Sequence, residues 1–485
     1  MFLASLVGCA ASPVQPAEPR ASESLLRSAD LEADLDIVEH SYRALHPGLA
    51  RYNTPAEIDA LFAHTRDAFR HDQSLADAYV ELTRLTAGIR CGHSFPNPAN
   101  LPKATAAALF DRSRLPFLFD WYHGEMVVTR DFTGQLPAGS IVQSINGTPT
   151  KTMLTTLLPL ARADGHNDAK RVAYLSDVGD GEHEGFDILA PLVFPSVFER
   201  GKPFWITARE PDGSTVVTAL RPQTVAERVA AAPAPDESGA SGPLWSLEWR
   251  DRIAYLPMRT WVTYHTKRDW QADVEAMMAD VIAKDAPTLI VDLRGNEGGS
   301  DVGDIILAHL IDQPLRRGAM SRRVRFRSVP TELRANLDTW DPTFVDLGKD
   351  ATAQPDGWFA LPAEPGASEI VPKGPRYRGR VIVLVDATNS SATFQFALTV
   401  QQAKLGTIVG APTGGNQRGI NGGAFFFVQL PHTHLEVDLP LIGTFPDGDA
   451  PDQGVIPDVL IETTPADRAA NRDPVMAAAL NRARR

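Results

Sequence analysis

The sequence predicts an α/β protein, and a strand–helix–strand unit within residues 377–410 is its clearest element. A continuous apolar run at residues 381–385 is typical of a strand buried on both faces of a parallel sheet. Apolar residues then recur at helical spacing over residues 394–405, and a third apolar run at 407–409 closes the unit.

Two earlier runs extend this pattern. Residues 253–257 and 288–292 are predicted strands, with an amphipathic helix over 270–282 between them and a glycine-rich turn and a helix at 305–311 after them. The alternation of strands and helices favours a parallel sheet covered by helices.

The junction between strand 381–385 and its helix contains two serines, Ser390 and Ser391. In an open α/β sheet, ligands bind at the carboxyl ends of the strands, and a serine there has its hydroxyl beside the free N–H groups of a helix start. The alternative is that Ser390 or Ser391 only caps the helix.

Composition bounds the function. A chain of 485 residues is too long for one ordinary core, and 43% hydrophobic with 22% charged residues is typical of a soluble globular protein. The net charge of −13 argues against a nucleic acid as partner. No apolar stretch reaches the ~18 residues of a spanning helix, and two cysteines, Cys9 and Cys91, predict no disulfide framework.

The segment 1–27 predicts a targeting signal and a tether. Leu6-Val7-Gly8-Cys9 follows an apolar start and resembles a bacterial lipoprotein signal, in which the cysteine is lipidated. The residues that follow are rich in Ala, Pro and Ser, which is typical of a disordered tether. We therefore expect a periplasmic protein, lipid-anchored to the envelope through Cys9. A frayed apolar N-terminus is the alternative.

Residues 28–100 are predicted to be a helical subdomain. Its third helix, at about 75–89, runs into a short loop that contains His93 between Gly92 and Pro96. A lone histidine in a loop is usually a solvated side chain. His93 becomes a candidate only if another part of the chain needs a base.

Residues 101–222 contain short strand-like runs around the turn Asn146-Gly147. The stretch 136–149 resembles the centre of a PDZ domain, which binds an extended peptide at the edge of a sheet. A plain β-hairpin is the alternative. Residues 164–200 lack periodicity and are predicted to be a loop or insertion, and residues 223–243 a low-complexity linker.

The α/β core is predicted over residues 244–465, with an irregular insertion at 312–376 that covers or frames the site. A C-terminal segment, 466–485, follows and contains an amphipathic helix at about 474–482.

The order of these motifs resembles the C-terminal-processing (tail-specific) and tricorn family of serine peptidases over residues 28–465. The resemblance rests on four stretches: residues 292–299 (Asp-Leu-Arg-Gly-Asn-Glu-Gly-Gly), Ser391-Ala392 with Phe396-Ala397, residues 410–415 and residues 454–458. It implies an N-terminal helical subdomain, a PDZ-like β-rich domain and a ClpP/crotonase-like α/β catalytic core.

The resemblance also implies a catalytic apparatus. Ser391 would be the nucleophile, and the backbone N–H groups of Gly299 and Ala392 would stabilise the oxyanion. The lysine of the processing branch is absent, because Asn416 stands at its place. His93 matches the histidine of the tricorn branch and would be the general base. Asp452 stands one residue from the expected acid, which is Pro451 here, and would orient or assist His93.

Phe394 also departs from the family pattern, since a glutamate is expected there. Two functions therefore remain open. The first is a serine endopeptidase, without metal or cofactor, that hydrolyses unfolded or C-terminal protein segments in the cell envelope. The alternative is a peptide-binding or scaffolding protein on a degenerate peptidase fold.

Overall fold

The structure, a computed structural model, describes residues 25–179, 181–232, 242–316, 320–362 and 369–484. The predicted lipoprotein-type signal with Cys9 lies outside these residues. Helices and several sheets are mixed along the chain, which confirms the α/β class. None of the helices in the described ranges is long and apolar enough to cross a membrane.

The predicted parallel sheet is present. Its strand order is β20-β17-β16-β9-β8-β7, and every pair is parallel except the antiparallel pair of β7 and β8. All residues of β9 and all but the first of β16 are buried, as continuous apolar runs predict. The strands are β7 (Glu248–Arg250), β8 (Ile253–Pro257), β9 (Thr288–Asp292), β16 (Arg380–Val385), β17 (Thr407–Gly410) and β20 (Val459–Leu460).

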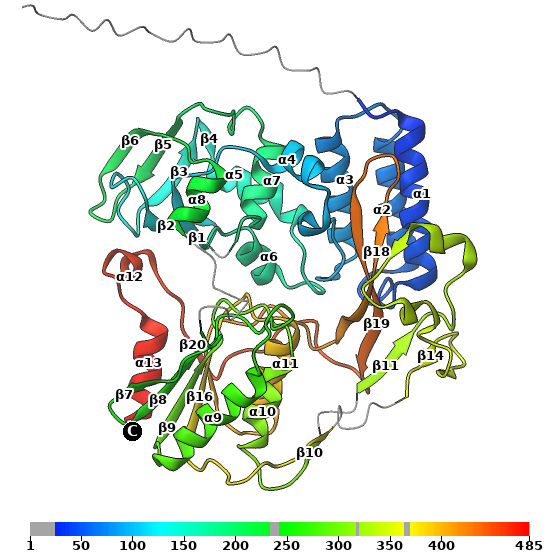
Figure 1. The fold of residues 1–485 in the computed structure, drawn as a ribbon. Coiled ribbons are helices and arrows are strands. Elements are labelled where there is room, and N and C mark those ends of the chain that lie inside the picture. Colours follow the sequence, from blue (N-terminus) through cyan, green and yellow to red (C-terminus); the bar gives the residue numbers. More distant parts are fainter. Residues whose placement is uncertain (1–24, 180, 233–241, 317–319, 363–368, 485) are drawn as a thin grey trace, which may run out of the picture.

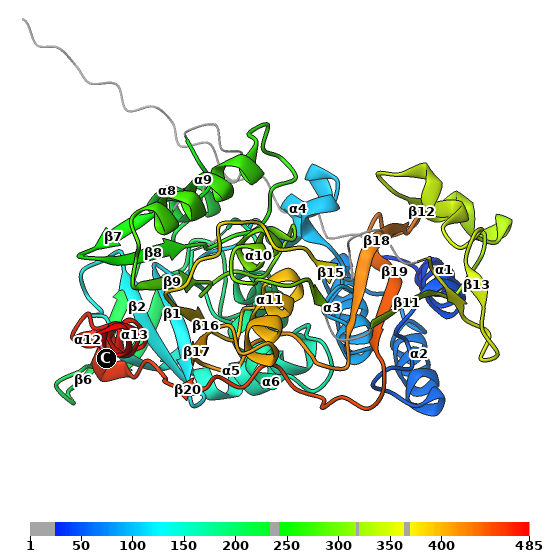
Figure 2. The same cartoon turned by 90° about the horizontal axis from the view of Figure 1, so that it is seen from below.

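Helices cover both faces of this sheet (Figures 1 and 2). On one face, Val274, Val302 and Phe396 of three helices share a core with β9 and β16. On the other face, Val475 of the C-terminal helix packs with Ile290. These helices are α9 (Trp270–Ala283), α10 (Val302–Ala308), α11 (Ser391–Gln402) and α13 (Pro474–Ala483), and the short α12 (Pro465–Ala469) precedes the last.

The N-terminal helices pack against a second sheet of order β12-β18-β19-β11-β14-β13. Tyr42 of the first helix donates a hydrogen bond to the carbonyl of Asp438, at 2.6 Å. The helices are α1 (Ser28–Leu45), α2 (Pro55–Ala68), α3 (Leu75–Gly88) and α4 (Lys103–Phe110), with η1 (Pro98–Asn100). The strands are β11 (Met320–Val324), β12 (Leu337–Asp338), β13 (Thr352–Ala353), β14 (Phe359–Ala360), β18 (Ile420–Gln429) and β19 (Glu436–Pro446).

This second sheet departs from the expectation that residues 244–465 form one core. β18 and β19 lie within that range but belong to the core of the N-terminal helices. Most of β18 alternates between buried and less buried residues, which suits a sheet that is covered on one face. Residues 312–376 supply its other strands, besides η3 (Thr331–Asn336), η4 (Pro342–Asp346), β10 (Leu315–Arg316) and β15 (Glu369–Ile370).

A third, antiparallel sheet has the order β1-β2-β3-β5-β6, with β4 paired to β3. Asn146 and Gly147 have φ of +48° and +79° between β3 and β4, which confirms the turn that their sequence predicts. The strands are β1 (Phe117–Tyr122), β2 (Glu125–Asp131), β3 (Ile141–Ile145), β4 (Thr148–Pro149), β5 (Phe204–Arg209) and β6 (Thr215–Leu220); α5 (Thr150–Leu157) and η2 (Leu158–Leu160) follow β4.

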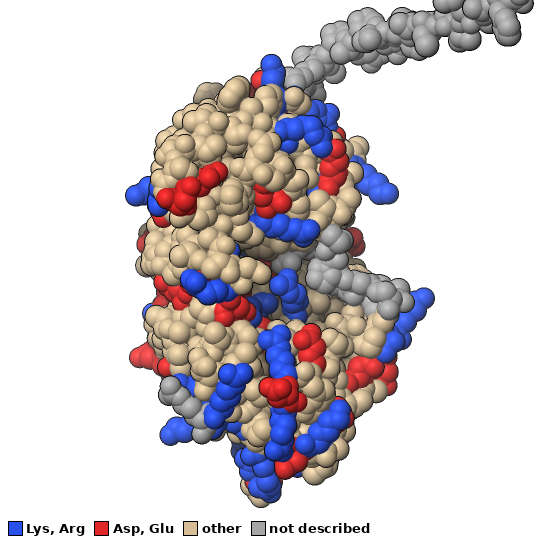
Figure 3. Space-filling model, turned by 90° about the vertical axis from the view of Figure 1, so that its left-hand side faces the viewer, with Lys and Arg blue, Asp and Glu red and all other residues tan. Residues whose placement is uncertain are grey.

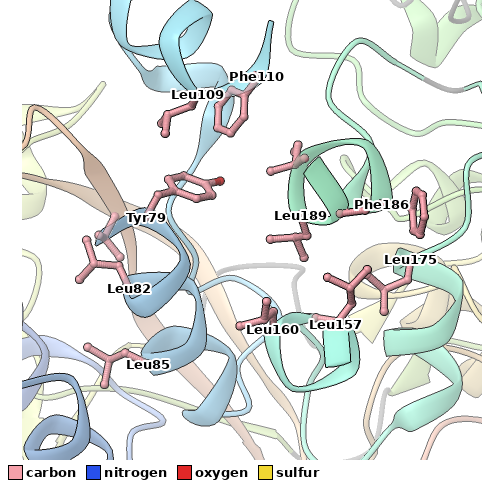
Figure 4. Close-up of a cluster of buried hydrophobic side chains, with 14 of the residues drawn as sticks. Tyr79, Leu82, Leu85, Leu109, Phe110, Leu157, Leu160, Leu175, Phe186 and Leu189 are labelled. Carbon is pink, nitrogen blue, oxygen red and sulfur yellow. The ribbon is translucent and has the colours of Figure 1, made fainter. Parts of the chain in front are cut away.

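The antiparallel sheet and the N-terminal helices share one hydrophobic core. Figure 4 shows Tyr79 of α3 pointing towards Leu189 of α7 (Gly185–Val193), with Phe110 above it and with Leu157 and Leu160 below. All five side chains are buried. This core holds the end of α3, and hence the loop with His93, in a fixed place relative to the segment that follows η2.

Two segments that were predicted to lack structure contain helices. Residues 164–200 hold α6 (Asp168–Tyr174) and α7 (Gly185–Val193), and the predicted linker holds α8 (Val225–Ala231). α8 begins at a capping box of Thr224 and Glu227, and Arg228 is buried as an ion pair with Asp177. These helices are short, so their periodicity is weak, and tertiary contacts stabilise them.

Charges of both signs are interspersed on the face drawn in Figure 3, and neither sign forms a broad patch there.

Candidate active site

Ser391 occupies a strained turn between β16 and α11. Its φ is +48°, a left-handed conformation that costs a non-glycine residue on the order of 1–3 kcal/mol. The buried Asn389 holds the turn, because its side chain donates to the carbonyls of Leu293, at 2.5 Å, and Asn296, at 2.9 Å. The nucleophile candidate is therefore anchored on the turn that follows the neighbouring strand β9.

The helix-cap alternative does not describe these serines. Ser390 is at the N-cap position, but its side chain makes no cap hydrogen bond and instead donates to the carbonyl of Glu297, at 2.9 Å. Across the described ranges, no hydrogen bond to the Ser391 hydroxyl is found. Ser390 is engaged in structure, while Ser391 is free to react.

The turn after β9 approaches Ser391 closely, and only glycine fits there. A Cβ on Gly298 would lie 2.8 Å from the Cβ of Ser391, and one on Gly299 would lie 2.2 Å from the carbonyl oxygen of Trp261. Both glycines also have positive φ, +115° and +134°. Within the described part of the chain, the N–H groups of Gly299 and Ala392 have no hydrogen-bond acceptor. They are therefore available to stabilise an oxyanion.

His93 lies in a loop that is held from several sides. The N–H of Gly92 donates to Asp164, at 2.9 Å, and the Arg162 guanidinium donates to the carbonyl of Gly92, at 2.7 Å. Arg162 also stacks over the ring of Phe95, at 4.2 Å from its centroid. Phe95 in turn accepts a backbone hydrogen bond from β19. The alternative of a solvated loop histidine does not hold.

Burial lowers the pKa of His93 below its usual 6.5, and the nearby carboxylate of Asp164 opposes this shift most strongly. The ring is therefore neutral at pH 7, as a general base must be. Its buried Nδ1 has no hydrogen-bond partner among the described residues. In the same residues, no hydrogen bond joins His93 to Ser391.

His93 and Ser390 line one pocket. The pocket also contains an ion pair: the Lys170 ammonium donates to the Glu297 carboxylate and, at 2.9 Å, to the carbonyl of Thr388. Partial desolvation would raise the pKa of the half-exposed Glu297, but Lys170 and Arg162 hold this pKa at about 2. The other residues that line this pocket are Gly92, Arg162, Ala163, Asp164 and Gly414.

Asp452 does not contact His93 in this structure. It accepts from the buried Asn416, at 2.7 Å, and pairs with Nδ1 of His166, also at 2.7 Å. Asn416 donates further to the carbonyl of Asp164, at 3.3 Å. Asp452 therefore holds the segment beside His93 rather than the imidazole, so the predicted orienting contact is not made here.

The sequence prediction omitted Arg162, Asp164, Lys170 and Glu297. Arg162, Asp164 and Lys170 lie in or next to the segment predicted to be a loop, where no periodicity or motif marks them. Glu297 stands inside the glycine-rich motif, but nothing in the sequence pairs it with Lys170. No cluster of three or more possible metal ligands occurs among the residues that the structure describes.

A serine on a strained strand–helix turn, facing a two-glycine loop on the neighbouring strand, is the arrangement of a serine-type peptidase. Residues 252–461 match the sequence profile of Peptidase family S41. The match contains β9 with its glycine turn, Ser391 and Asp452. None of the curated proteins compared matches the chain.

The fold is similar to that of CPAF. The mature CPAF complexed with lactacystin has a TM-score of 0.63 at 15% identity, over 94% of this chain and 97% of that chain. Mature CPAF has a TM-score of 0.59, also at 15% identity, over 91% and 94%. The photosystem II D1 C-terminal processing protease has a TM-score of 0.41 at 13% identity, over 90% and 93%. At these identities, the likeness to CPAF shows the fold alone.

Proposed function

We propose that this protein is a serine endopeptidase with Ser391 as nucleophile and His93 as general base. The observation that carries the proposal is the position of Ser391: its φ is +48°, and Gly298 approaches its Cβ so closely that any side chain there would collide. Such strain persists only when the surrounding structure imposes it, and it is typical of active sites.

The chemistry follows from the groups present. The Ser391 hydroxyl attacks the carbonyl carbon of the scissile bond and passes its proton to His93. The N–H groups of Gly299 and Ala392 stabilise the oxyanion. His93 then protonates the leaving amine, and a water molecule hydrolyses the acyl-enzyme. His93 must come within about 3 Å of the Ser391 hydroxyl in the substrate complex, where contacts that are loose in a free enzyme tighten.

The proposed substrates are unfolded or C-terminal protein segments, because only an extended chain offers its backbone to such a site. The antiparallel sheet ends in the edge strand β6, and PDZ-like addition of a peptide to this edge would supply further affinity. The location that we propose is the periplasm, with a lipid anchor at Cys9, on the strength of the segment 6–9. Replacing Cys9 by Ser should then release the protein from the membrane fraction; retention there would refute the anchor.

One observation favours the second candidate, a peptide-binding protein without turnover. The Nδ1 atom of His93 has no partner among the described residues, so no carboxylate fixes the tautomer of the base. A catalytic histidine usually receives such support.

Labelling with a fluorophosphonate separates the two candidates. The peptidase should react at Ser391, and peptide mapping should find the label there. Ser391→Ala should abolish labelling and peptide hydrolysis, whereas Ser390→Ala should keep both, because Ser390 only bonds to Glu297. Unlabelled wild-type protein, or Ser391→Ala with full turnover, would overturn the proposal in favour of the binding protein.

A further inference from the structure

The less buried face of β18 presents aromatic rings next to the site. Along this strand, which Figure 1 draws in orange, Ala424, Phe426 and Val428 point into the core. Phe425 and Phe427 alternate with them and lie on the opposite face, where they are only partly buried. These two neighbouring phenylalanine rings leave apolar surface exposed, and other residues of the chain cover this face of β18 only in part.

The partial cover is Trp340, which follows β12. Its ring lies 5.8 Å from that of Phe425 and 5.7 Å from that of Phe427, while Phe344 holds it edge-on at 5.4 Å. Trp340 nevertheless remains 59% exposed. We call Trp340, Phe425 and Phe427 the aromatic platform.

The aromatic platform begins at the proposed base. The ring of Phe425 lies 5.9 Å from that of His93, and Trp340 comes next, 5.8 Å further on. An extended peptide advances ~3.3 Å per residue. In the substrate complex of the proposed mechanism, where His93 lies beside Ser391, the aromatic platform is therefore within reach of the side chains roughly two to four residues from the scissile bond.

An edge of β18 is also free beside the aromatic platform. β12 pairs with β18 only at Phe427 and Val428, and no other strand in the described ranges continues along that edge towards Ile420. An extended peptide added there would pair its backbone with β18 and place alternate side chains beside Phe425 and Trp340.

We propose that the aromatic platform is a substrate subsite for one aromatic or large aliphatic side chain near the scissile bond. This inference rests on the proposed peptidase function and names its substrate class. Burying such a side chain removes apolar surface of both partners from water, and ring–ring contact adds to the gain.

A positional library of fluorogenic peptides tests the subsite. Wild-type enzyme should prefer Phe, Tyr, Trp or Leu at one position near the cleaved bond. Trp340→Ala should lower kcat/KM for those peptides about tenfold, mainly through KM, and leave peptides with Ser at that position unchanged. Trp205→Ala is the matched control, because Trp205 is 57% exposed on β5. This variant should leave kcat/KM unchanged for both groups of peptides. Equal losses for all peptides, or unchanged selectivity, would overturn the subsite.

Binding to Ser391→Ala separates this inference from the peptidase proposal. That variant should still bind the preferred peptide, with its affinity reduced about tenfold by Trp340→Ala in the double variant. If the wild type cleaves nothing but this binding difference is measured, the peptidase proposal fails and the subsite stands. If peptides are cleaved and the difference is absent, the subsite fails alone.

Discussion

The two halves of the proposed active site are built in different ways. The nucleophile half comes from the turns after β9 and β16, which are neighbouring strands of one parallel sheet. The base half comes from three segments far apart in the chain: the loop with His93, the segment with Arg162 and Asp164, and β19. The first half is therefore local to one sheet, while the second depends on how separate regions pack together.

This difference explains which half the sequence predicts. Parallel strands bring their carboxyl ends to the same edge, so residues just after two such strands must meet, wherever they stand in the chain. No comparable rule links a helix end to a loop of another region. The packing that Figure 4 shows has to be known before Gly92 can be placed beside Arg162 and Asp164.

The largest expected effect tests whether the base half works at all. His93→Ala should lower kcat roughly 10²–10⁴-fold, the usual value of a general base. In the wild type, the rate should rise with pH through the pKa of His93, because only the neutral ring accepts a proton. Burial lowers that pKa, so the rise should be centred below pH 6.5. A kcat–pH profile on both proteins measures this.

Lys404→Ala serves as the control for a lysine base. Lys404 follows the C-terminal end of α11, at the opposite end of that helix from Ser391, and its loss should leave the profile unchanged. A His93→Ala protein that retains the acid-side rise would show that another group is the base.

The predictability of the fold follows the same division. The runs at 381–385 and 288–292 predict buried parallel strands because the first is apolar throughout and the second has the apolar centre Leu289-Ile290-Val291. The predicted core of residues 244–465 includes β18, whereas the strand packs with the N-terminal helices, because its alternating pattern shows that one face is buried but not against which helices. Short helices such as α6 were not predicted, because seven residues are too few to show a helical period in the sequence.

Within the site, Ser391, Gly299 and Ala392 were predicted from motifs, and the structure brings all three to one edge of the sheet. The Lys170–Glu297 ion pair was not predictable, since α6 reaches that edge only through tertiary packing. Asp452 was predicted to lie near the base because of its position relative to a family motif. In the structure, Asn416 lies between them and donates a hydrogen bond to the Asp452 carboxylate.

A second prediction tests the nucleophile half. Gly298→Ala should lower kcat roughly 10²–10³-fold, the value of a lost oxyanion donor, because the new methyl group would collide with Ser391 and push the turn away. KM should change less, since the collision affects the transition state. Steady-state kinetics together with a thermal melt measures both.

Gly295→Ala is the matched control in the same turn. Gly295 also has a positive φ, +82°, but a Cβ there meets no atom within 4 Å. This variant should lose about 1–2 kcal/mol of stability from backbone strain and keep its kcat. Equal kcat losses in both variants would mean that strain, rather than contact with Ser391, determines the activity.

The smallest expected effect asks which carboxylate serves the base. Asp164 opposes the burial of His93 and so raises its pKa; removing the charge in Asp164→Asn should lower that pKa further. Because activity requires the neutral ring, the acid-side rise in kcat should move to lower pH, with little change at neutral pH. The asparagine can still accept the hydrogen bond from Gly92, which preserves the loop.

Asp452→Asn is the comparison that decides the assignment. Asp452 reaches His93 only through Asn416 and the segment at Asp164, so its loss should weaken kcat or stability without moving the acid-side rise. If Asp452→Asn moves the rise and Asp164→Asn does not, the charge that acts on His93 in the substrate complex is that of Asp452. The base half would then rearrange when the substrate binds, and the Asp452–His93 contact predicted from the sequence would orient the base in the substrate complex.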